Sequence, residues 1–265
     1  MIRLDELNYA EHMNKNGFDR MCSIYELTIY AKWLKYLGET DEYIEKDLIK
    51  FAKEHDENFN YQIHYYKIDN ALKNMSEYSL RLPITTIVTK NEWDSICRVS
   101  DERFRRVLFI MLVVAKFLKN NDTWIGEKER NYLQDLYGLF CVSDTDIYKL
   151  AHVSFNPKTD RDKMFREFHK LGLAKFMARK SSYRYVTFVD DDSEPFIEIN
   201  DYKHLIWYYD RQTGVDNIFE CSLCGGLFKK RTNNQIYCSD NCLKTSKKNW
   251  KRKYDKSRKQ NNNII

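Results

Sequence analysis

Four of the chain's seven cysteines lie within 22 residues, in the segment CSLCGGLFKKRTNNQIYCSDNC. They form two pairs, Cys221-x2-Cys224 and Cys238-x3-Cys242, which thirteen residues separate. Two cysteine pairs on short loops are what a tetrahedral Zn²⁺ ion with sulfur ligands requires. The sequence therefore predicts a structural zinc site in which all four thiolates bind the metal and no coordination position is left for a substrate.

The residues around the cysteines favour a small zinc finger. Gly225 and Gly226 allow a tight turn after the first pair, and the stretch 227–237 has the length of a β-hairpin. Ser239 is a suitable N-cap for a following helix, whose positive end favours a thiolate at Cys242. The tight turn at the first cysteine pair, called a zinc knuckle, is followed by a hairpin and a helix. Together these elements predict a treble clef, the arrangement of many small zinc fingers.

The motif CSLCG…YCSDNC resembles small bacterial zinc proteins such as the DNA gyrase inhibitor family, although the loop between the pairs differs slightly in length. The resemblance covers the finger alone. Treble clefs bind nucleic acid, dock other proteins or only staple a short domain. The resemblance implies the zinc finger, and it leaves these three roles open.

A strongly basic helix is expected after the finger. Its sequence is LKTSKKNWKRKYDKSRKQ, with nine Lys and Arg among eighteen residues. Residues 220–265 carry 12 Lys and Arg and 3 Asp and Glu, a net charge of +9, while residues 1–219 carry 32 and 36, a net charge of −4. Such a concentration of positive charge favours a polyanionic partner. The residues expected to contact phosphates are Lys247, Lys248, Lys251, Arg252 and Lys253.

The same helix has an alternative interpretation. A run of charges is more often a solvated surface than a binding site. Trp250 and Tyr254 lie four residues apart, and we expect them to pack on the finger rather than on nucleic-acid bases.

Composition limits the fold class of the whole chain. With 43% apolar residues, 8 Gly and 3 Pro in 265 residues, we expect a folded, mainly helical protein with small β-hairpins. The longest apolar run, 107–115, has nine residues, whereas a bilayer span needs about 20, so it predicts a core helix and no membrane anchor. The acidic N-terminus is unlike a secretory signal. We therefore expect a cytoplasmic protein with reduced thiols.

Soft boundaries near Arg81-Leu82-Pro83 and Thr213-Gly214 divide the chain into three expected parts. These are a helical N-terminal module at 1–80, a second domain at 81–213, and the finger with its basic helix at 214–265. In the N-terminal module, Ser23 and Thr40 are predicted to cap helices over 24–38 and 41–55. A third helix follows, with its inward face marked by Tyr61, Tyr65, Ile68, Leu72 and Met75.

The middle part has the order of a winged helix. A short helix over 146–152, a break at Asn156-Pro157, a helix beginning at Thr159 and ending at Gly172, and two β-rich runs at 173–179 and 183–189 follow one another. This order resembles the winged helix-turn-helix domains of DNA-binding regulators. The resemblance implies that the second helix lies in the major groove and that the hairpin touches the DNA backbone.

If the resemblance holds, six basic residues in this part are candidates for DNA contact. Three share one face of the second helix, because positions three and four apart lie together: Lys163, Arg166 and Lys170. Three surround the expected wing: Arg179, Lys180 and Arg184. Acidic side chains on the same helix count against the assignment, since they would repel phosphates: Asp160, Asp162 and Glu167.

The sequence contains none of the common catalytic motifs. A P-loop, GxSxG, HExxH and the dinucleotide glycine pattern are absent, and the finger lacks the histidines of an HNH nuclease. The acidic stretch 190–194 is expected to be solvated. The sequence therefore predicts a protein that is not an enzyme.

Across most of the chain, the layout resembles proteins encoded by bacteriophages and other mobile elements of low-GC bacteria. The residues that carry it are YAKWLKYLGETDEYIEKDLIKFAKEH, LPITTIVTKNEW, RDKMFREFHKLGL and DDSEPFIEINDY, together with the finger. This resemblance implies a setting and no mechanism.

Three functions remain open at this point. The first is a DNA-binding regulatory protein whose partner is duplex DNA. The second is a protein-binding inhibitor or adaptor directed at a host protein, such as a component of a defence system. The third is an RNA-binding protein, and each of the three is compatible with a homo-oligomer.

Overall fold

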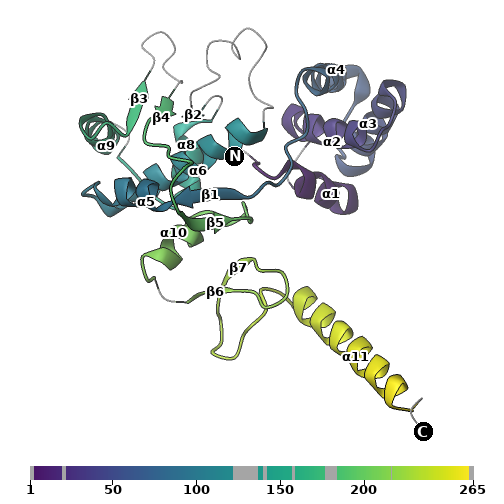
Figure 1. The fold of residues 1–265 in the computed structure, drawn as a ribbon. Helices are drawn as coiled ribbons and strands as arrows, with labels where there is room; N and C mark the ends of the chain where they lie inside the picture. Colours follow the sequence, from purple (N-terminus) through teal and green to yellow (C-terminus); the bar gives the residue numbers. More distant parts are fainter. Residues whose placement is uncertain are drawn as a thin grey trace. The chain divides into compact units, whose positions relative to one another are not determined.

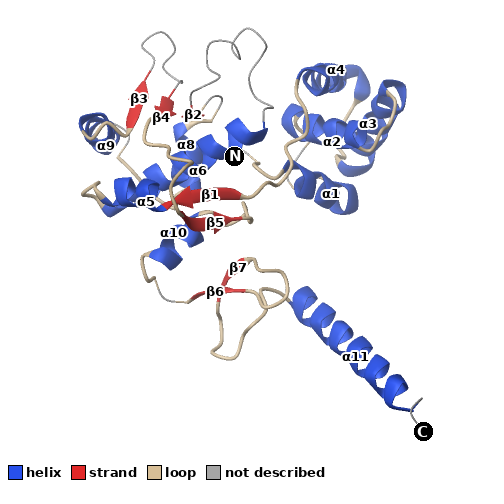
Figure 2. Cartoon of the chain, viewed as in Figure 1, coloured by secondary structure: helices blue, strands red, loops and turns tan. Residues whose placement is uncertain are grey.

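The protein is mainly helical, with small antiparallel sheets, in a computed structural model (Figures 1 and 2). The structure describes residues 3–19, 22–121, 137–139, 142–156, 159–176, 184–215 and 217–262, with the backbone alone from 253 onward. The chain divides into two compact units, residues 1–203 and 204–265. None of the helices in these described ranges is long and apolar enough to cross a membrane.

The N-terminal module is a bundle of four helices with a core of its own. They are α1 (Glu6–Asn16), α2 (Ile24–Tyr36), α3 (Asp41–His55) and α4 (Tyr61–Glu77). The predicted caps are confirmed, because the side chains of Ser23 and Thr40 accept hydrogen bonds from the backbone N–H groups of Glu26 and Tyr43. The core joins residues from all four helices, among them Met13, Leu27, Leu48 and Ile68.

The inward face of α4 differs from the prediction at its N-terminal end. Ile68 and Met75 are buried as expected, but Tyr61 and Tyr65 are 39% and 58% exposed. The buried residues of α4 are Ile68, Ala71 and Met75. The buried face of the helix is therefore narrower than the five predicted positions indicated.

A buried ionic cluster joins the first helix of the bundle to the linker that follows α4. Glu6 is fully buried and pairs with Arg81, 2.6 Å away, and with Lys32, 3.3 Å away. The Glu6 carboxylate also accepts a hydrogen bond from the backbone N–H of Arg81. Because a buried charge needs partners, this cluster fixes where the chain leaves the bundle.

The second part of the first unit is organised around one long apolar helix. Here α6 (Glu102–Asn121) buries every residue from Val107 to Leu118, which confirms the predicted core helix. Before it, β1 (Thr86–Thr89) leads into α5 (Lys90–Cys97) through a capping box in which Thr89 and Glu92 bond reciprocally. Strand β1 pairs antiparallel with β5 (Pro195–Ile199), so segments far apart in sequence close this part.

The predicted helix, turn, helix and hairpin order is observed between these two strands. It comprises α8 (Asp144–Leu150), α9 (Thr159–Lys170), β3 (Ala174–Phe176) and β4 (Arg184–Val186). Gly172 ends α9 with a φ of +70°, and the backbone N–H of Leu173 donates to the carbonyl of Phe168. A short strand, β2 (Tyr137–Gly138), adds to the hairpin and gives a three-stranded sheet of order β2-β4-β3.

The second unit begins ten residues earlier than the expected third part. It contains α10 (Ile206–Gln212), β6 (Ile218–Glu220), β7 (Leu227–Lys229) and α11 (Asp240–Asn262). Helix α10 contacts both strands of the β6–β7 hairpin, which is why it belongs with the finger. The buried side chains of Ile218, Leu227 and Phe228 form the apolar part of this small unit.

Candidate metal centre and nucleic-acid interface

The first cysteine pair sits in the turn of the β6–β7 hairpin. The backbone N–H of Gly225 donates to the carbonyl of Cys221, and that of Cys221 donates to the carbonyl of Gly226. Gly225 has a φ of +71°, a conformation that glycine adopts without strain. The turn therefore closes tightly enough to aim Cys221 and Cys224 at one point.

The prediction of a hairpin over 227–237 is wrong. Strand β7 pairs with β6, which precedes the cysteine pair, in the register Ile218 to Lys229 and Glu220 to Leu227. The stretch after β7 forms turns that return to the knuckle, where the backbone N–H of Ser222 donates to the carbonyl of Ile236. The knuckle has two glycines and is itself a tight turn, so it supplies the hairpin that the longer stretch was expected to form.

The second pair is carried by the start of α11. The Ser239 hydroxyl accepts a hydrogen bond from the backbone N–H of Cys242, 3.3 Å away, which confirms Ser239 as the cap. Cys238 lies just before this cap, and its own N–H donates to Sγ of Cys221 across a distance of 3.4 Å. The helix start thus brings the second pair against the first.

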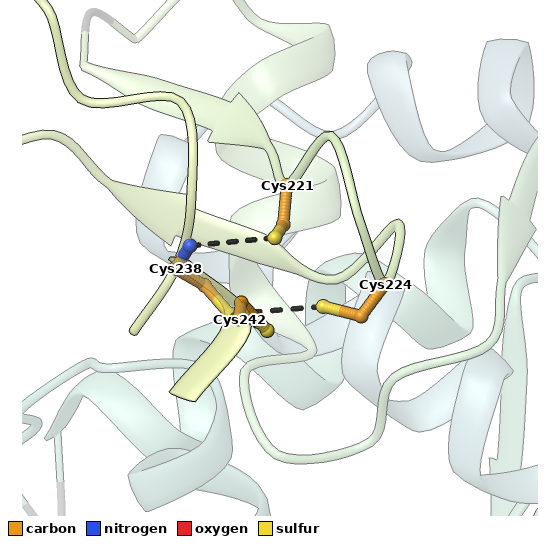
Figure 3. Close-up of side chains that lie close together, drawn as sticks. All are labelled: Cys221, Cys224, Cys238 and Cys242. Carbon is orange, nitrogen blue, oxygen red and sulfur yellow. Dashed lines mark hydrogen bonds between the residues drawn. The ribbon is translucent and has the colours of Figure 1, made fainter. Parts of the chain in front are cut away.

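All four predicted ligands converge (Figure 3). Their sulfur atoms lie within 4.8 Å of one another, with 3.6 Å between Cys224 and Cys238 and 3.5 Å between Cys238 and Cys242. A tetrahedral zinc with Zn–S bonds of about 2.3 Å would hold its sulfurs about 3.8 Å apart. Four soft donors at nearly this spacing could hold a metal ion.

The protonation of these thiols depends on their immediate neighbours. Burial raises the pKa of Cys221, but hydrogen bonds from the backbone of Cys224, Cys238 and Leu223 outweigh it and bring the pKa down to about 6. Burial, followed by the contact with the thiol of Cys242, raises the pKa of Cys238 to about 12. The backbone N–H donors therefore favour a thiolate at Cys221. The thiol of Cys238, which is buried against Cys242, needs a bound cation to lose its proton.

Of the other three cysteines, Cys22 and Cys97 are described, and neither is part of this cluster. Cys22 is buried, and burial raises the pKa of its thiol to about 11. Cys97 is exposed. Cys141 lies outside the described residues.

The three basic residues predicted on α9 lie on its exposed side. Lys163, Arg166 and Lys170 are exposed, while Met164 and Phe168 on the opposite side are fully buried. Within the described residues, no ion pair joins any of these three cations to an acidic side chain. The helix thus offers a row of positive charges to solvent.

Two of the acidic residues that weigh against DNA binding have internal partners. Asp160 pairs with Arg103 at 3.4 Å and accepts a hydrogen bond from the backbone N–H of Asn156. Glu167 accepts a hydrogen bond of 2.6 Å from the backbone N–H of Ser100, in the turn before α6. The sequence could not reveal Arg103 and Ser100 as partners, because each lies more than fifty positions away along the chain. Asp162 stays exposed.

The prediction that Arg184 contacts a phosphate is wrong. Its side chain is 5% exposed and forms an ion pair with Asp144 at the start of α8. Burial lowers the pKa of Arg184, and the carboxylate of Asp144 opposes that effect. Arg184 therefore joins the hairpin to the first helix of the pair. The other two wing candidates, Arg179 and Lys180, lie outside the described residues.

The basic face of α11 is exposed as predicted. Lys247, Lys248, Lys251 and Arg252 are all exposed, and the side chain of Lys253 lies outside the described set. Trp250, which was expected to pack on the finger, has 66% of its surface exposed. The finger reaches α11 at Ser246, whose hydroxyl hydrogen-bonds with Tyr237 at 2.7 Å.

The acidic stretch 190–194 takes part in a buried network that the sequence did not predict. Lys116 of α6 is buried and lies 2.8 Å from both Glu92 and Asp191. Glu92 also accepts a hydrogen bond from the backbone N–H of Asp190. Burial raises the pKa of Asp191, but the hydrogen bonds from Lys116 and Tyr137 lower it by more than burial raises it. The pKa of Asp191 is therefore below its usual value. Asp191 is thus a structural partner of Lys116.

Comparison of the chain with protein-family models, with curated proteins and with solved structures gives no match. The resemblances drawn from the sequence therefore stay predictions.

Proposed function

We propose that the protein is a zinc-containing, DNA-binding regulatory protein. In this proposal α9 enters the major groove of duplex DNA, and the zinc finger presents the basic helix α11 to the phosphate backbone. A protein of this kind acts by occupying a site on DNA, so it needs no catalytic residue.

The order of elements in the first unit supports a winged helix. That fold has a first helix, a short strand, two further helices and a hairpin whose second strand pairs with the short strand. Here α6, β2, α8, α9, β3 and β4 follow in that order, and β4 lies between β2 and β3 in the sheet. In such a domain α9 takes the position of the recognition helix.

The observation that carries the proposal is the distribution of charge on α9. Lys163, Arg166 and Lys170 face solvent, whereas Asp160 and Glu167 are engaged with Arg103 and with the backbone of Ser100. The helix has acidic residues in its sequence, yet its exposed row is mainly basic. Such a row suits the negative potential of DNA, and Arg166 at its centre has the fork geometry that binds guanine.

The chemistry of the finger supports zinc as its metal. Four cysteine sulfurs without carboxylate or imidazole are a donor set that favours Zn²⁺ in a structural role. Bound there, the ion would join the β6–β7 knuckle to the start of α11, as in a treble clef. The four ligands leave no open position, so the metal would hold α11 in place and perform no chemistry.

A second function is favoured by a different observation. Large apolar side chains are exposed on the N-terminal bundle: Tyr36, Leu37, Tyr43, Ile63, Tyr65 and Tyr66. Exposed aromatic residues are the usual anchors of protein interfaces. Under this alternative the bundle docks a host protein, as an inhibitor or adaptor would, and DNA binding is secondary or absent.

Substitution of two arginines tests the proposal. Arg166→Ala should weaken binding to a preferred duplex by roughly 1–3 kcal/mol and should weaken binding to random duplexes less, because in this proposal Arg166 contacts base edges. Arg252→Ala should weaken binding to all duplexes alike. It should also make the slope of log affinity against log salt shallower by about 0.9, the contribution of one phosphate contact. Binding constants from fluorescence anisotropy would decide. Equal losses from both variants on every sequence would exclude base recognition by α9.

A further inference from the structure

The carboxylate of Asp162 faces solvent on α9, the helix proposed to enter the major groove. The two charged residues that precede it on the helix have partners: Asp160 pairs with Arg103, and Arg161 lies 2.9 Å from Asp144. Asp162 is exposed, and within the described ranges of the chain no ion pair or hydrogen bond involves its carboxylate. A negative charge is thus left free on the helix proposed to meet a polyanion.

Asp162 belongs to the exposed face that has Arg166 at its centre. Asp162 lies four residues before Arg166, one helical turn away. Lys163 and Lys170 lie three residues before and four residues after the same arginine, so all three side chains border its guanidinium. The fully buried Phe168 marks the opposite side of the helix. The exposed face therefore carries three cations and one carboxylate.

A free carboxylate is repelled by phosphates, but it suits one of the four bases. In the major groove, guanine and thymine offer acceptors, adenine offers an acceptor beside its amino group, and cytosine offers only the N4–H₂ donor. A carboxylate accepts hydrogen bonds and donates none. It therefore binds the cytosine amino group and is repelled by the acceptors of the other bases, so it selects against wrong bases as well as for the right one.

The position of Asp162 along α9 fits contact with base edges. Residues near the N-terminus of a recognition helix reach the bases, and Asp162 lies in the first turn of α9. An alternative explanation is that an acidic residue in the first turn stabilises the helix through the helix dipole. That effect needs no partner on DNA, and it predicts no influence on the sequence that is bound.

We infer that Asp162 accepts a hydrogen bond from the N4 amino group of a cytosine, close to a guanine that Arg166 contacts. The inference rests on the proposed function, because it takes α9 as the recognition helix, and it adds a second base to the preferred site. Four residues of α-helix rise about 6 Å, and base pairs follow one another every 3.4 Å or so, about two base-pair steps. The cytosine is therefore expected within about two base pairs of the guanine.

Selection of bound sequences from a randomised duplex pool tests the inference. The full zinc-loaded chain and each variant are equilibrated with the pool, and the bound duplexes are sequenced. The variants are Asp162→Ala, Asp162→Asn and, as the matched control, Glu45→Ala, which removes an exposed carboxylate from α3 in the N-terminal bundle. Circular dichroism and zinc content establish that each variant is folded.

The wild-type protein should bind its selected duplex about tenfold more tightly than a duplex in which the cytosine pair is changed. For Asp162→Ala this ratio should fall to about twofold or less, while the guanine preference of Arg166 remains. Asp162→Asn should move the preference at that position from cytosine to adenine, because an amide side chain bonds to both N6 and N7 of adenine. Glu45→Ala should select the wild-type sequence.

Three results would overturn the inference. If both Asp162 variants selected the same sequence as the wild type, Asp162 would have no part in recognition, and duplex binding by α9 would still stand. If the wild-type protein bound duplexes without sequence preference, base contact by α9 would be excluded. If the wild-type protein bound no duplex, the proposed function would fail and the inference with it.

Discussion

The backbone N–H of Ser100 donates a hydrogen bond of 2.6 Å to Oε1 of Glu167. The donor lies in the turn that precedes α6, and the acceptor is on α9, the helix proposed to face DNA. The bond ties the Glu167 carboxylate to the turn before α6, although Glu167 lies within one helical turn of Lys163 and Lys170. A helix with acidic residues in its sequence can in this way present a basic surface.

Glu167→Gln should change duplex affinity little, because the charge that it removes is engaged by the backbone N–H of Ser100, and glutamine retains the acceptor for that bond. Lys163→Glu on the exposed row should weaken duplex binding by roughly tenfold at about 0.1 M salt, the value of one phosphate contact. Anisotropy titrations of both variants at one salt concentration measure the difference. A large gain in affinity from Glu167→Gln would show that the carboxylate does face the DNA.

Arg184 is predicted to matter for stability and not for binding. Arg184→Ala removes the buried partner of Asp144, which keeps its ion pair with the more exposed Arg161, so the free energy of unfolding should fall by about 2 kcal/mol. Urea denaturation followed by circular dichroism measures this loss. Arg166→Ala is the matched control, since it removes an exposed guanidinium and should leave stability unchanged within about 0.5 kcal/mol. A stable Arg184→Ala protein with weakened DNA binding would contradict the structure's placement of this residue.

The buried network around Lys116 gives a second stability prediction. Lys116→Ala would leave the carboxylate of Glu92 buried without a counter-charge, so the free energy of unfolding should fall by about 3 kcal/mol or more. Lys50→Ala, which removes an exposed lysine from its pair with Glu54, should cost less than about 0.5 kcal/mol. Thermal and urea unfolding of the two variants should thus differ clearly, and equal stabilities would refute the network's role.

Metal removal should affect the second unit selectively. We expect one zinc ion per chain, measured by elemental analysis, and its extraction by a strong chelator should raise amide hydrogen exchange across 217–252 while the first unit keeps its protection. Cys238→Ser should mimic the chelator, because it removes one of the four ligands. The same variant at Cys97, which is exposed and lies outside the cluster, should keep a full equivalent of zinc.

The zinc affinity should also fall as the pH falls. Metal binding requires all four thiols to lose their protons, and the pKa of Cys238 in the metal-free site is raised to about 12, so zinc displaces a proton there. Acidification returns protons to the sulfurs and should release the ion. A zinc-sensitive dye would follow the release. A zinc content that stays constant in strong acid would exclude a thiolate site.

Local features of this fold could be predicted from the sequence. Ser23, Thr40 and Ser239 cap helices through their own side chains, and Gly172 ends α9 through its positive φ, so each signal lies within a few residues of its effect. The cysteine spacing likewise predicted which four residues lie together, because the turn that carries Cys221 and Cys224 and the helix start that carries Cys238 and Cys242 are both short segments.

What the sequence did not reveal depends on distant contacts. The pairing of β1 with β5, the burial of Arg184 against Asp144 and the bond from Ser100 to Glu167 all join segments that propensity and periodicity treat separately. A basic residue in a β-rich run gives no sign of whether it faces a phosphate or a buried carboxylate. The exposure of Trp250 likewise depends on how far the finger extends along α11, which helical spacing alone does not show.

The most direct test of DNA binding is titration of the zinc-loaded protein with random and genomic duplex DNA across a salt series. Each neutralised phosphate contributes about −0.9 to the slope of log affinity against log salt, and contacts from α9 and α11 together should give a slope of about −5. The account predicts that slope, with a subset of genomic sequences bound more tightly than random duplex. An absence of duplex binding at moderate salt would contradict it and would direct attention to a protein partner for the N-terminal bundle.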